Sequence, residues 1–296
     1  SRRQRQMCIR DSGRSEGLAI ASLRLFEGGV LSQNGLDDPL RVDAAPLTNI
    51  TPKILASVFQ VSENNPLVGL EERAKLLNEL GQALIRHKHM FEFGDALRPG
   101  NLYDYFLQRQ EKGVLAAREI LIAILKSMGE IWPDGSWVDS IAIGDAAYHE
   151  AVKRSDITDR IVPFHKLSQW MSYSLIEPLQ LAGMKIIHLD ALTGLAEYRN
   201  GGLFIDTGTI SLRDETEMET VHDPKSPLIV EWRALTVTLL DQLAEQIRRH
   251  TNTNAESMPL VSILQGGTWS AGRRIAQKLR SDASPPLRLK SRGTIF

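Results

Sequence analysis

Apolar residues recur at helical spacing along most of this 296-residue chain, and this pattern limits the possible folds more than any other feature. Segments with this spacing, bounded by cap and turn residues, predict helices at 15–26, from Pro52 onward, and at 66–87, 102–110, 114–128, 163–182 and 228–250. Strand signals are few, and the short apolar runs 185–187 and 202–206 fit either a strand or a buried helical turn. The sequence therefore predicts a mainly α protein, a single helical domain with at most a few short strands.

Composition narrows the class of protein. The chain has 35 basic and 36 acidic residues, so neither sign of charge favours nucleic acid as a partner. No apolar run approaches the ~18 residues of a membrane span. The only cysteine, Cys8, excludes a disulfide framework and a multi-thiolate metal site. We expect a cytoplasmic enzyme or binding protein with neither a nucleic-acid nor a membrane partner.

The first twelve residues, SRRQRQMCIRDS, differ from the rest of the chain. They are rich in arginine, lack the apolar core of a signal peptide and have no helical period. We interpret residues 1–12 as a non-native, adapter-derived segment of a metagenomic gene fragment, and 13–296 as one catalytic-type domain truncated at its N-terminus. A natural basic tail is the alternative. Without this segment 31 basic residues face 35 acidic ones, a charge of −4, and the basic residues concentrate near the C-terminus, which favours a local anion site.

The run Phe204-Ile205-Asp206-Thr207-Gly208-Thr209 has two enzymatic interpretations. It matches the catalytic loop of aspartic proteases, but that chemistry needs two carboxylates on a β-rich scaffold. It also resembles the loop that binds phosphoribosyl pyrophosphate, although one acidic residue and the parallel sheet are missing. Asp206 is otherwise a cap of a helix or turn.

Two further motifs could bind a phosphate or a metal ion. Gly266-Gly267-Thr268 predicts a glycine-rich turn before a basic helix, where backbone N–H groups with Arg273 and Arg274 would suit a phosphate; a solvated amphipathic helix is the alternative. His87 and His89 stand two residues apart, so on a helix their imidazoles point away from each other. We expect neither a metal site nor another cofactor.

Residues 161–214 combine varied polar side chains with apolar positions that belong to a core. Such groups must be paired or face a cavity. Lys166, Gln169 and Tyr173 share one helix face. Both a ligand pocket and a satisfied structural network fit this pattern.

Several strings resemble a fungal and bacterial family, the uracil-catabolism protein four family, which is sometimes described as uracil-phosphoribosyltransferase-like. They are 13–18, 59–61, 65–70, 162–170, 192–195, 197–202, 230–236 and 266–269. The resemblance covers essentially all of 13–296, and it implies a role in pyrimidine degradation.

A more distant resemblance links the chain to the queuosine-salvage family of nucleotide N-glycosidases. That family has a helical, DNA-glycosylase-like fold, which the resemblance implies here. The matching positions are Lys166 and Gln169, then Leu192-Thr193 with Glu197-Tyr198-Arg199, then Glu231 with Arg233-Ala234. Glu197 stands where that family has its catalytic aspartate, so its carboxylate is displaced by about one C–C bond.

These resemblances imply an enzyme that hydrolyses the N-glycosidic bond of a small phosphorylated nucleoside-type substrate, such as a ring-opened uridine nucleotide. Cleavage passes through an oxocarbenium-like transition state, which a buried carboxylate stabilises. We expect Glu197 as the catalytic carboxylate, with Asp206 or Glu231 as a second acid. The expected substrate-binding residues are Lys166, Gln169, Trp170, Tyr198, Arg199, Arg233, Arg273 and Arg274. The alternatives are a uracil phosphoribosyltransferase-like enzyme and a non-catalytic nucleotide-binding regulator.

Overall fold

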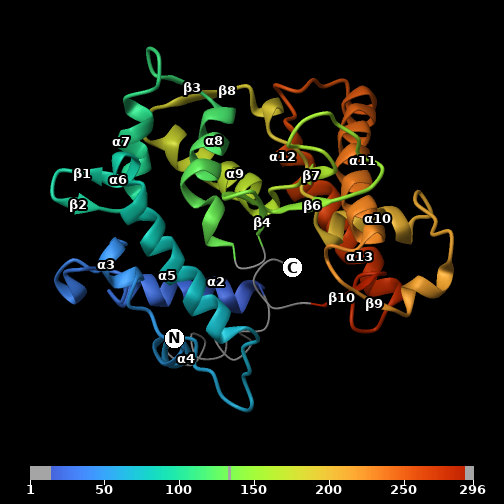
Figure 1. Ribbon diagram of the computed structural model, residues 1–296. Helices are drawn as coiled ribbons and strands as arrows, with labels where there is room; N and C mark the ends of the chain where they lie inside the picture. Colours follow the sequence, from blue (N-terminus) through green and yellow to red (C-terminus); the bar gives the residue numbers. More distant parts are fainter. Residues whose placement is uncertain (1–14, 133–134, 291–296) are drawn as a thin grey trace. The chain divides into compact units, whose positions relative to one another are not determined.

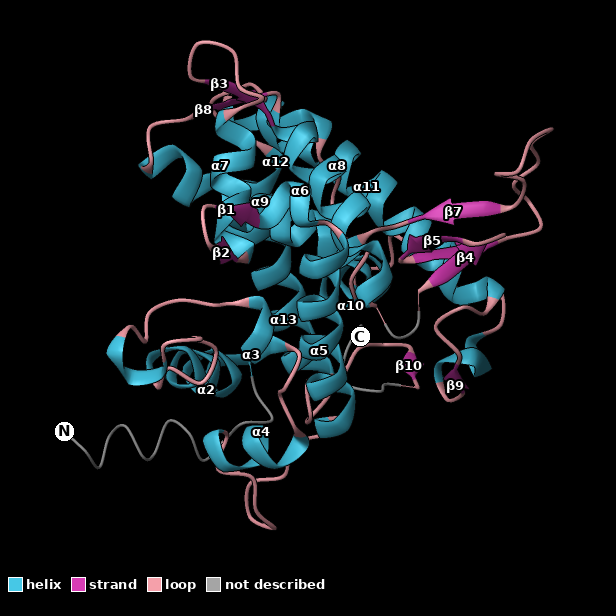
Figure 2. Cartoon of the chain, turned by 60° about the vertical axis from the view of Figure 1, so that its left-hand side comes forward, coloured by secondary structure: helices cyan, strands magenta, loops and turns pink. Residues whose placement is uncertain are grey.

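Helices dominate the computed structural model, which describes residues 15–132 and 135–290 (Figures 1 and 2). The mainly α prediction is confirmed, while a DNA-glycosylase-like arrangement of the helices stays a prediction. The interpretation of residues 1–12 concerns a segment outside the described residues. The described chain divides into two compact units: residues up to 109 with 130–132, and residues 110–129 with 135–290.

The first unit is built from helices and one short hairpin. Its elements are α2 (Ser15–Glu27), α3 (Ala44–Leu47), α4 (Pro52–Val58), α5 (Leu70–Arg86), α6 (Lys88–Phe91), β1 (Glu92–Phe93), β2 (Ala96–Leu97) and α7 (Leu102–Leu107). Thr51 begins α4 as expected, because its hydroxyl accepts a hydrogen bond from the Ile54 amide (3.2 Å) and Pro52 occupies the first turn. Helix α5 packs against α3 and α4.

The second unit holds the longer helices together with short paired strands. Its helices are α8 (Ala117–Met128), α9 (Lys166–Leu181), α10 (Tyr198–Asp206), α11 (Pro227–Thr251), α12 (Leu260–Ile263) and α13 (Trp269–Leu279). Its strands are β3 (Val114–Ala116), β4 (Ser136–Val138), β5 (Ile141–Gly144), β6 (Ala146–Tyr148), β7 (Ile161–Pro163), β8 (Lys185–Ile187), β9 (Val221–His222) and β10 (Arg288–Leu289). The pairs β4–β5 and β6–β7 are antiparallel, whereas β3–β8 and β9–β10 are parallel.

The two ambiguous apolar runs have different structures. Residues 185–187 form strand β8, and residues 202–206 form the second half of helix α10. Gly201 explains why α10 can pack so closely: a Cβ there would lie 2.7 Å from the Thr236 hydroxyl and 2.8 Å from the Trp232 indole, both on α11. A Cβ on Gly272 of α13 would come closer still to the Arg199 carbonyl oxygen. Small residues therefore let α10 lie against both α11 and α13 (Figure 1).

The predicted glycine-rich turn at 266–267 is wrong. Residues 264–268 form a π-helical segment that continues α12 into α13. The backbone is helical through both glycines, because i→i+5 hydrogen bonding widens the helix there without ending it. The N–H groups expected to bind a phosphate are thus part of a continuous helix.

Two apolar clusters of the second unit support the segment that carries the candidate site. One contains Ala147 of β6, Phe164, Ala196 and Val230 of α11. The other contains Ile205, Ile229, Trp232 and Leu287. Ala196 is 1% exposed, so the backbone immediately before α10 is fixed in the core.

Candidate active site

Asp145 lies at the centre of a buried charge cluster in the second unit. It occupies the turn between β5 and β6, and its side chain is 11% exposed. Its carboxylate accepts hydrogen bonds from both terminal nitrogens of Arg233 (2.9 and 2.8 Å) and from the Lys166 amide (2.9 Å). Burial favours the neutral acid, but the Arg233 guanidinium together with the amide and charge of Lys166 outweighs it and holds the pKa of Asp145 below its ordinary value. No sequence motif pointed to Asp145.

Arg233 is held from three directions. Besides its ion pair with Asp145, its Nε donates to the Ala196 carbonyl (3.3 Å) and its guanidinium lies 3.9 Å from the centre of the Phe164 ring. The side chain is only 6% exposed. Arg233, expected to bind substrate, therefore ties α11 to Asp145 and to the residue that precedes Glu197.

Lys166 begins α9 and is 8% exposed. Burial and the nearby Arg233 cation lower the pKa of Lys166 to about 8, while Asp145 and Glu197 act in the opposite direction. The amine thus changes charge close to neutral pH, as general acids, general bases and nucleophilic lysines do.

Glu197 is the N-cap residue of α10. Its two carboxylate oxygens accept hydrogen bonds from the Arg199 amide (2.8 Å) and the Asn200 amide (2.6 Å). Burial raises the pKa of Glu197 above its ordinary value, although these amides and the charges of Lys166 and Arg199 partly offset the effect. A carboxylate that is held in place by a cap and has a pKa above its ordinary value is suited to accept or donate a proton.

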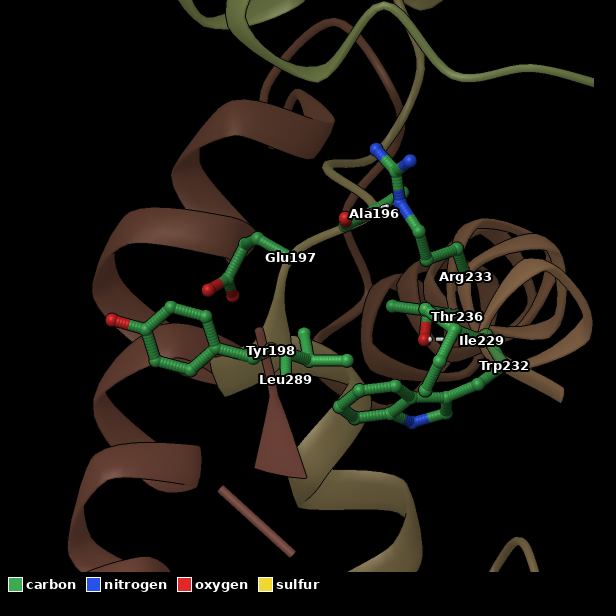
Figure 3. Close-up of a pocket in the computed structure, with 8 residues that line it drawn as sticks. All are labelled: Ala196, Glu197, Tyr198, Ile229, Trp232, Arg233, Thr236 and Leu289. Atoms are coloured by element: carbon green, nitrogen blue, oxygen red, sulfur yellow. Dashed lines mark hydrogen bonds between the residues drawn. The ribbon is translucent and has the colours of Figure 1, made fainter. Parts of the chain in front are cut away.

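A small enclosed cavity lies between Glu197 and α11 (Figure 3). It is lined by Ala196, Glu197, Tyr198, Ile229, Trp232, Arg233, Thr236 and Leu289. The centre of a water molecule can occupy a volume of about 10 Å³ there, so the cavity holds about one water molecule. Lys166 is not among the lining residues, and the Arg233 guanidinium points away from the Glu197 carboxylate.

The polar face of α9 holds the chain segment that leads to Glu197. The Gln169 side-chain oxygen accepts a hydrogen bond from the Thr193 amide (3.3 Å), and the Tyr173 hydroxyl donates to the Thr193 carbonyl (3.1 Å). Gln169 is buried as the shared face with Lys166 predicts. Trp170 is 53% exposed, so it lies on the outer side of the helix.

The other two carboxylates expected to be catalytic lie apart from Glu197. Asp206, the last residue of α10, forms a two-point ion pair with Arg280 (2.8 and 2.6 Å) and has a side chain that is only 4% exposed. Glu231 is 59% exposed and contacts His149 (3.2 Å). Asp145 thus joins Lys166 to Arg233, and the Lys166 charge acts on Glu197, whereas Asp206 and Glu231 have partners of their own.

The remaining basic candidates differ in position. Arg199 donates to the Ala283 carbonyl (2.6 Å) and lies 5.2 Å from the centre of the Tyr198 ring. On α13, Arg273 lies 5.6 Å from the centre of the Trp269 ring and Arg274 is exposed. Of these cations only that of Arg199 acts on the pKa of Glu197.

Within residues 15–132 and 135–290, no three histidine, cysteine, aspartate or glutamate side chains gather as metal ligands would. No helix between residues 15 and 290 combines the length and apolar character needed to cross a membrane.

Fold and site together define a mainly helical protein with a buried acid–base cluster at the beginnings of α9 and α10. The chain belongs to the family described as "Protein of unknown function (DUF1688)", which matches residues 3–296. It is 40% identical over 293 residues to Protein urg3 of Schizosaccharomyces pombe, covering 96% of this chain and 68% of that protein. It is 37% identical over 310 residues to Uracil catabolism protein 4 of Lachancea kluyveri, covering 96% of this chain and 69% of that protein. The resemblance to the uracil-catabolism family is thereby confirmed.

Proposed function

We propose that this protein acts in uracil catabolism by hydrolysing the N-glycosidic bond of a ribose 5-phosphate derivative. The name of the Lachancea kluyveri relative supports the pathway. The observation that carries the reaction is the placement of Glu197, a capped and buried carboxylate of raised pKa, within the electrostatic reach of the buried Lys166. The preferred substrate is a ring-opened uridine nucleotide, a ribose 5-phosphate that carries a urea group on C1; we call it the ureido nucleotide.

Glu197 would take the water proton in this reaction. The water oxygen forms a bond to C1 of the ribose, the C1–N bond breaks with its electron pair going to nitrogen, and the proton that Glu197 took from water passes to the leaving nitrogen. The products are ribose 5-phosphate and urea. A carboxylate beside C1 also stabilises the positive charge that develops there, and a well-placed acid or base contributes about 10²–10⁴ in rate.

Lys166 and Arg199 are the cations best placed for the phosphate or for orienting Glu197. Both influence the charge of Glu197, whereas Arg233 is engaged by Asp145. The cavity beside Glu197 holds about one water molecule and is too small for a sugar phosphate. Binding of the ureido nucleotide therefore requires that groups around Glu197 move.

A phosphoribosyltransferase has less support. Its loop would place Asp206 at the carboxyl end of a strand of a parallel sheet. Asp206 instead ends helix α10 and is paired with Arg280.

Incubation of the protein with the ureido nucleotide tests the proposal. We expect release of equal amounts of ribose 5-phosphate and urea without added pyrophosphate. Uridine monophosphate incubated with pyrophosphate is the matched control for a transferase. Formation of phosphoribosyl pyrophosphate there, or thermal stabilisation by nucleotide without any product in either reaction, would contradict the hydrolase and support a transferase or a binding protein, respectively.

A further inference from the structure

His165 has a backbone conformation that side chains rarely adopt. It lies between β7 and α9 with φ 49° and ψ 36°, in the left-handed region. This conformation is unfavourable for an L-residue with a side chain, and residues held in such regions cluster at functional sites. His165 also occupies the N-cap position of α9, yet its side chain makes no capping hydrogen bond.

Asp145 replaces His165 as the cap. Its carboxylate accepts a hydrogen bond from the Lys166 amide (2.9 Å), and its carbonyl accepts from the amides of Phe164 (3.0 Å) and His165 (2.8 Å). The His165 carbonyl in turn accepts from the Gln169 amide (2.8 Å). These four hydrogen bonds hold the backbone at the bend, and no described hydrogen bond of the fold uses the imidazole Nδ1.

The imidazole presents a polar atom that the described protein does not satisfy. Its Nδ1 is buried without a hydrogen-bond partner. Burial lowers the pKa of His165; Arg233 lowers it further, and Asp145 acts against both. The ring is consequently neutral near pH 7, with one nitrogen that donates and one that accepts.

A neutral imidazole limits the kind of ligand. A phosphate is best bound by charged donors, and a neutral ring supplies none. A urea or amide group is neutral and planar, and it offers both N–H donors and a carbonyl acceptor. It therefore fits either tautomer of the His165 ring. A buried nitrogen left unpaired is costly, so a ligand that pairs with it gains affinity.

We propose that His165 contacts the leaving group of the substrate, with Nδ1 hydrogen-bonded to the urea group of the ureido nucleotide. This inference rests on the proposed function and adds the residue that distinguishes substrate from product. Ribose 5-phosphate lacks the urea group, so its binding does not depend on the imidazole.

Two variants separate this contact from a structural role. His165→Gly removes the ring and tolerates the left-handed backbone, while His165→Asn also tolerates it and places a hydrogen-bonding atom near Nδ1. We expect His165→Gly to lower kcat/KM for the ureido nucleotide about tenfold or more, as loss of one buried hydrogen bond does, and His165→Asn to restore most of it. The Kd for ribose 5-phosphate, measured by calorimetry, should stay within about threefold in both variants. The proposed contact would be wrong if His165→Gly left kcat/KM unchanged, or if it weakened ribose 5-phosphate binding as much as it lowered kcat/KM.

A measurement on the unmodified protein separates this inference from the proposed function. In protein labelled with ¹⁵N-histidine, the His165 ring signal is the one absent from His165→Asn. It should shift when the ureido nucleotide is added and stay in place with ribose 5-phosphate. If the wild type binds the ureido nucleotide but releases no ribose 5-phosphate, the hydrolase proposal fails. A shift of the His165 signal would still support the contact with the urea group. No shift with the ureido nucleotide overturns the contact even if turnover is observed.

Discussion

Asp145 balances the charges on which the site depends. Its carboxylate joins the guanidinium of Arg233 to the first amide of α9, and its carbonyl holds the bend at His165. Removing one partner of a buried ion pair of this kind costs about 3–5 kcal/mol, because the other charge stays buried without compensation. Arg233 is for this reason a poor candidate for a substrate phosphate, since a phosphate would have to compete with Asp145.

Lys166 gives the proposed reaction a pH dependence. Its folded-state pKa of about 8 lies below the ordinary 10.5, so the amine is charged below pH 8 and loses its proton as the pH rises above it. If its charge holds the phosphate, kcat/KM for the ureido nucleotide should fall as the pH rises through about 8. The profile is measured between pH 6 and 10 for the wild type and for Lys166→Gln, which should be less active and show no fall near pH 8.

A rise of kcat/KM through pH 8 in the wild type would contradict this role. Such a profile would mean that the neutral amine is the active form, as a nucleophilic lysine requires.

Residue-level features of the site were only partly predictable from the sequence. Lys166, Gln169 and Glu197 stand in recognisable motifs; Lys166 and Glu197 act on each other's pKa, and Gln169 holds the Thr193 amide. Asp145 stands in no motif, because its importance comes from a backbone amide 21 positions away and a side chain 88 positions away along the chain. The orphaned Nδ1 of His165 depends on a backbone angle that no local pattern specifies.

Helices α10 and α13 are positioned by a close approach of their backbones. A Cβ on Gly272 would collide with the Arg199 carbonyl, two residues after Glu197. Backbone atoms cannot yield as a flexible side chain does, so α10 would have to shift. The crossing of these two helices therefore fixes the first turn of the helix that Glu197 caps.

Substitutions at two glycines of the same continuous helix test this crossing. We expect Gly272→Ala to lower the free energy of unfolding by about 1–3 kcal/mol through overpacking. Gly266→Ala is the matched control, because a Cβ there meets no atom within 4 Å; it should be neutral or stabilising by up to about 1 kcal/mol. Urea denaturation measures both, and equal effects of the two substitutions would contradict the packing argument.

At the level of elements, periodicity predicted the long helices well. The segments 15–26 and 228–250 correspond to α2 and α11 within about one residue at each end. The prediction for 163–182 began too early, because residues 161–163 pair with β6 and the bend at His165 delays the helix. The glycines at 266–267 resembled a turn, but helical hydrogen bonding continues through them.

At the scale of the whole molecule, the sequence indicated the mainly α class and the family, and both are confirmed. The division into two compact units had no counterpart in the composition or linker pattern. All residues of the candidate site, namely Asp145, His165, Lys166, Glu197 and Arg233, belong to the second unit. We therefore assign the proposed chemistry to that unit.

The proposed hydrolysis depends on the carboxylate of Glu197, so substitution of this residue is the decisive test. The variant Glu197→Gln keeps an oxygen for one capping hydrogen bond but cannot take a proton from water. The matched control is Glu231→Gln, which changes the exposed carboxylate on α11. We predict that the rate of ribose 5-phosphate release from the ureido nucleotide falls about 10²–10⁴-fold in Glu197→Gln and stays within about twofold of the wild type in Glu231→Gln. Turnover by Glu197→Gln at the wild-type rate would contradict the account.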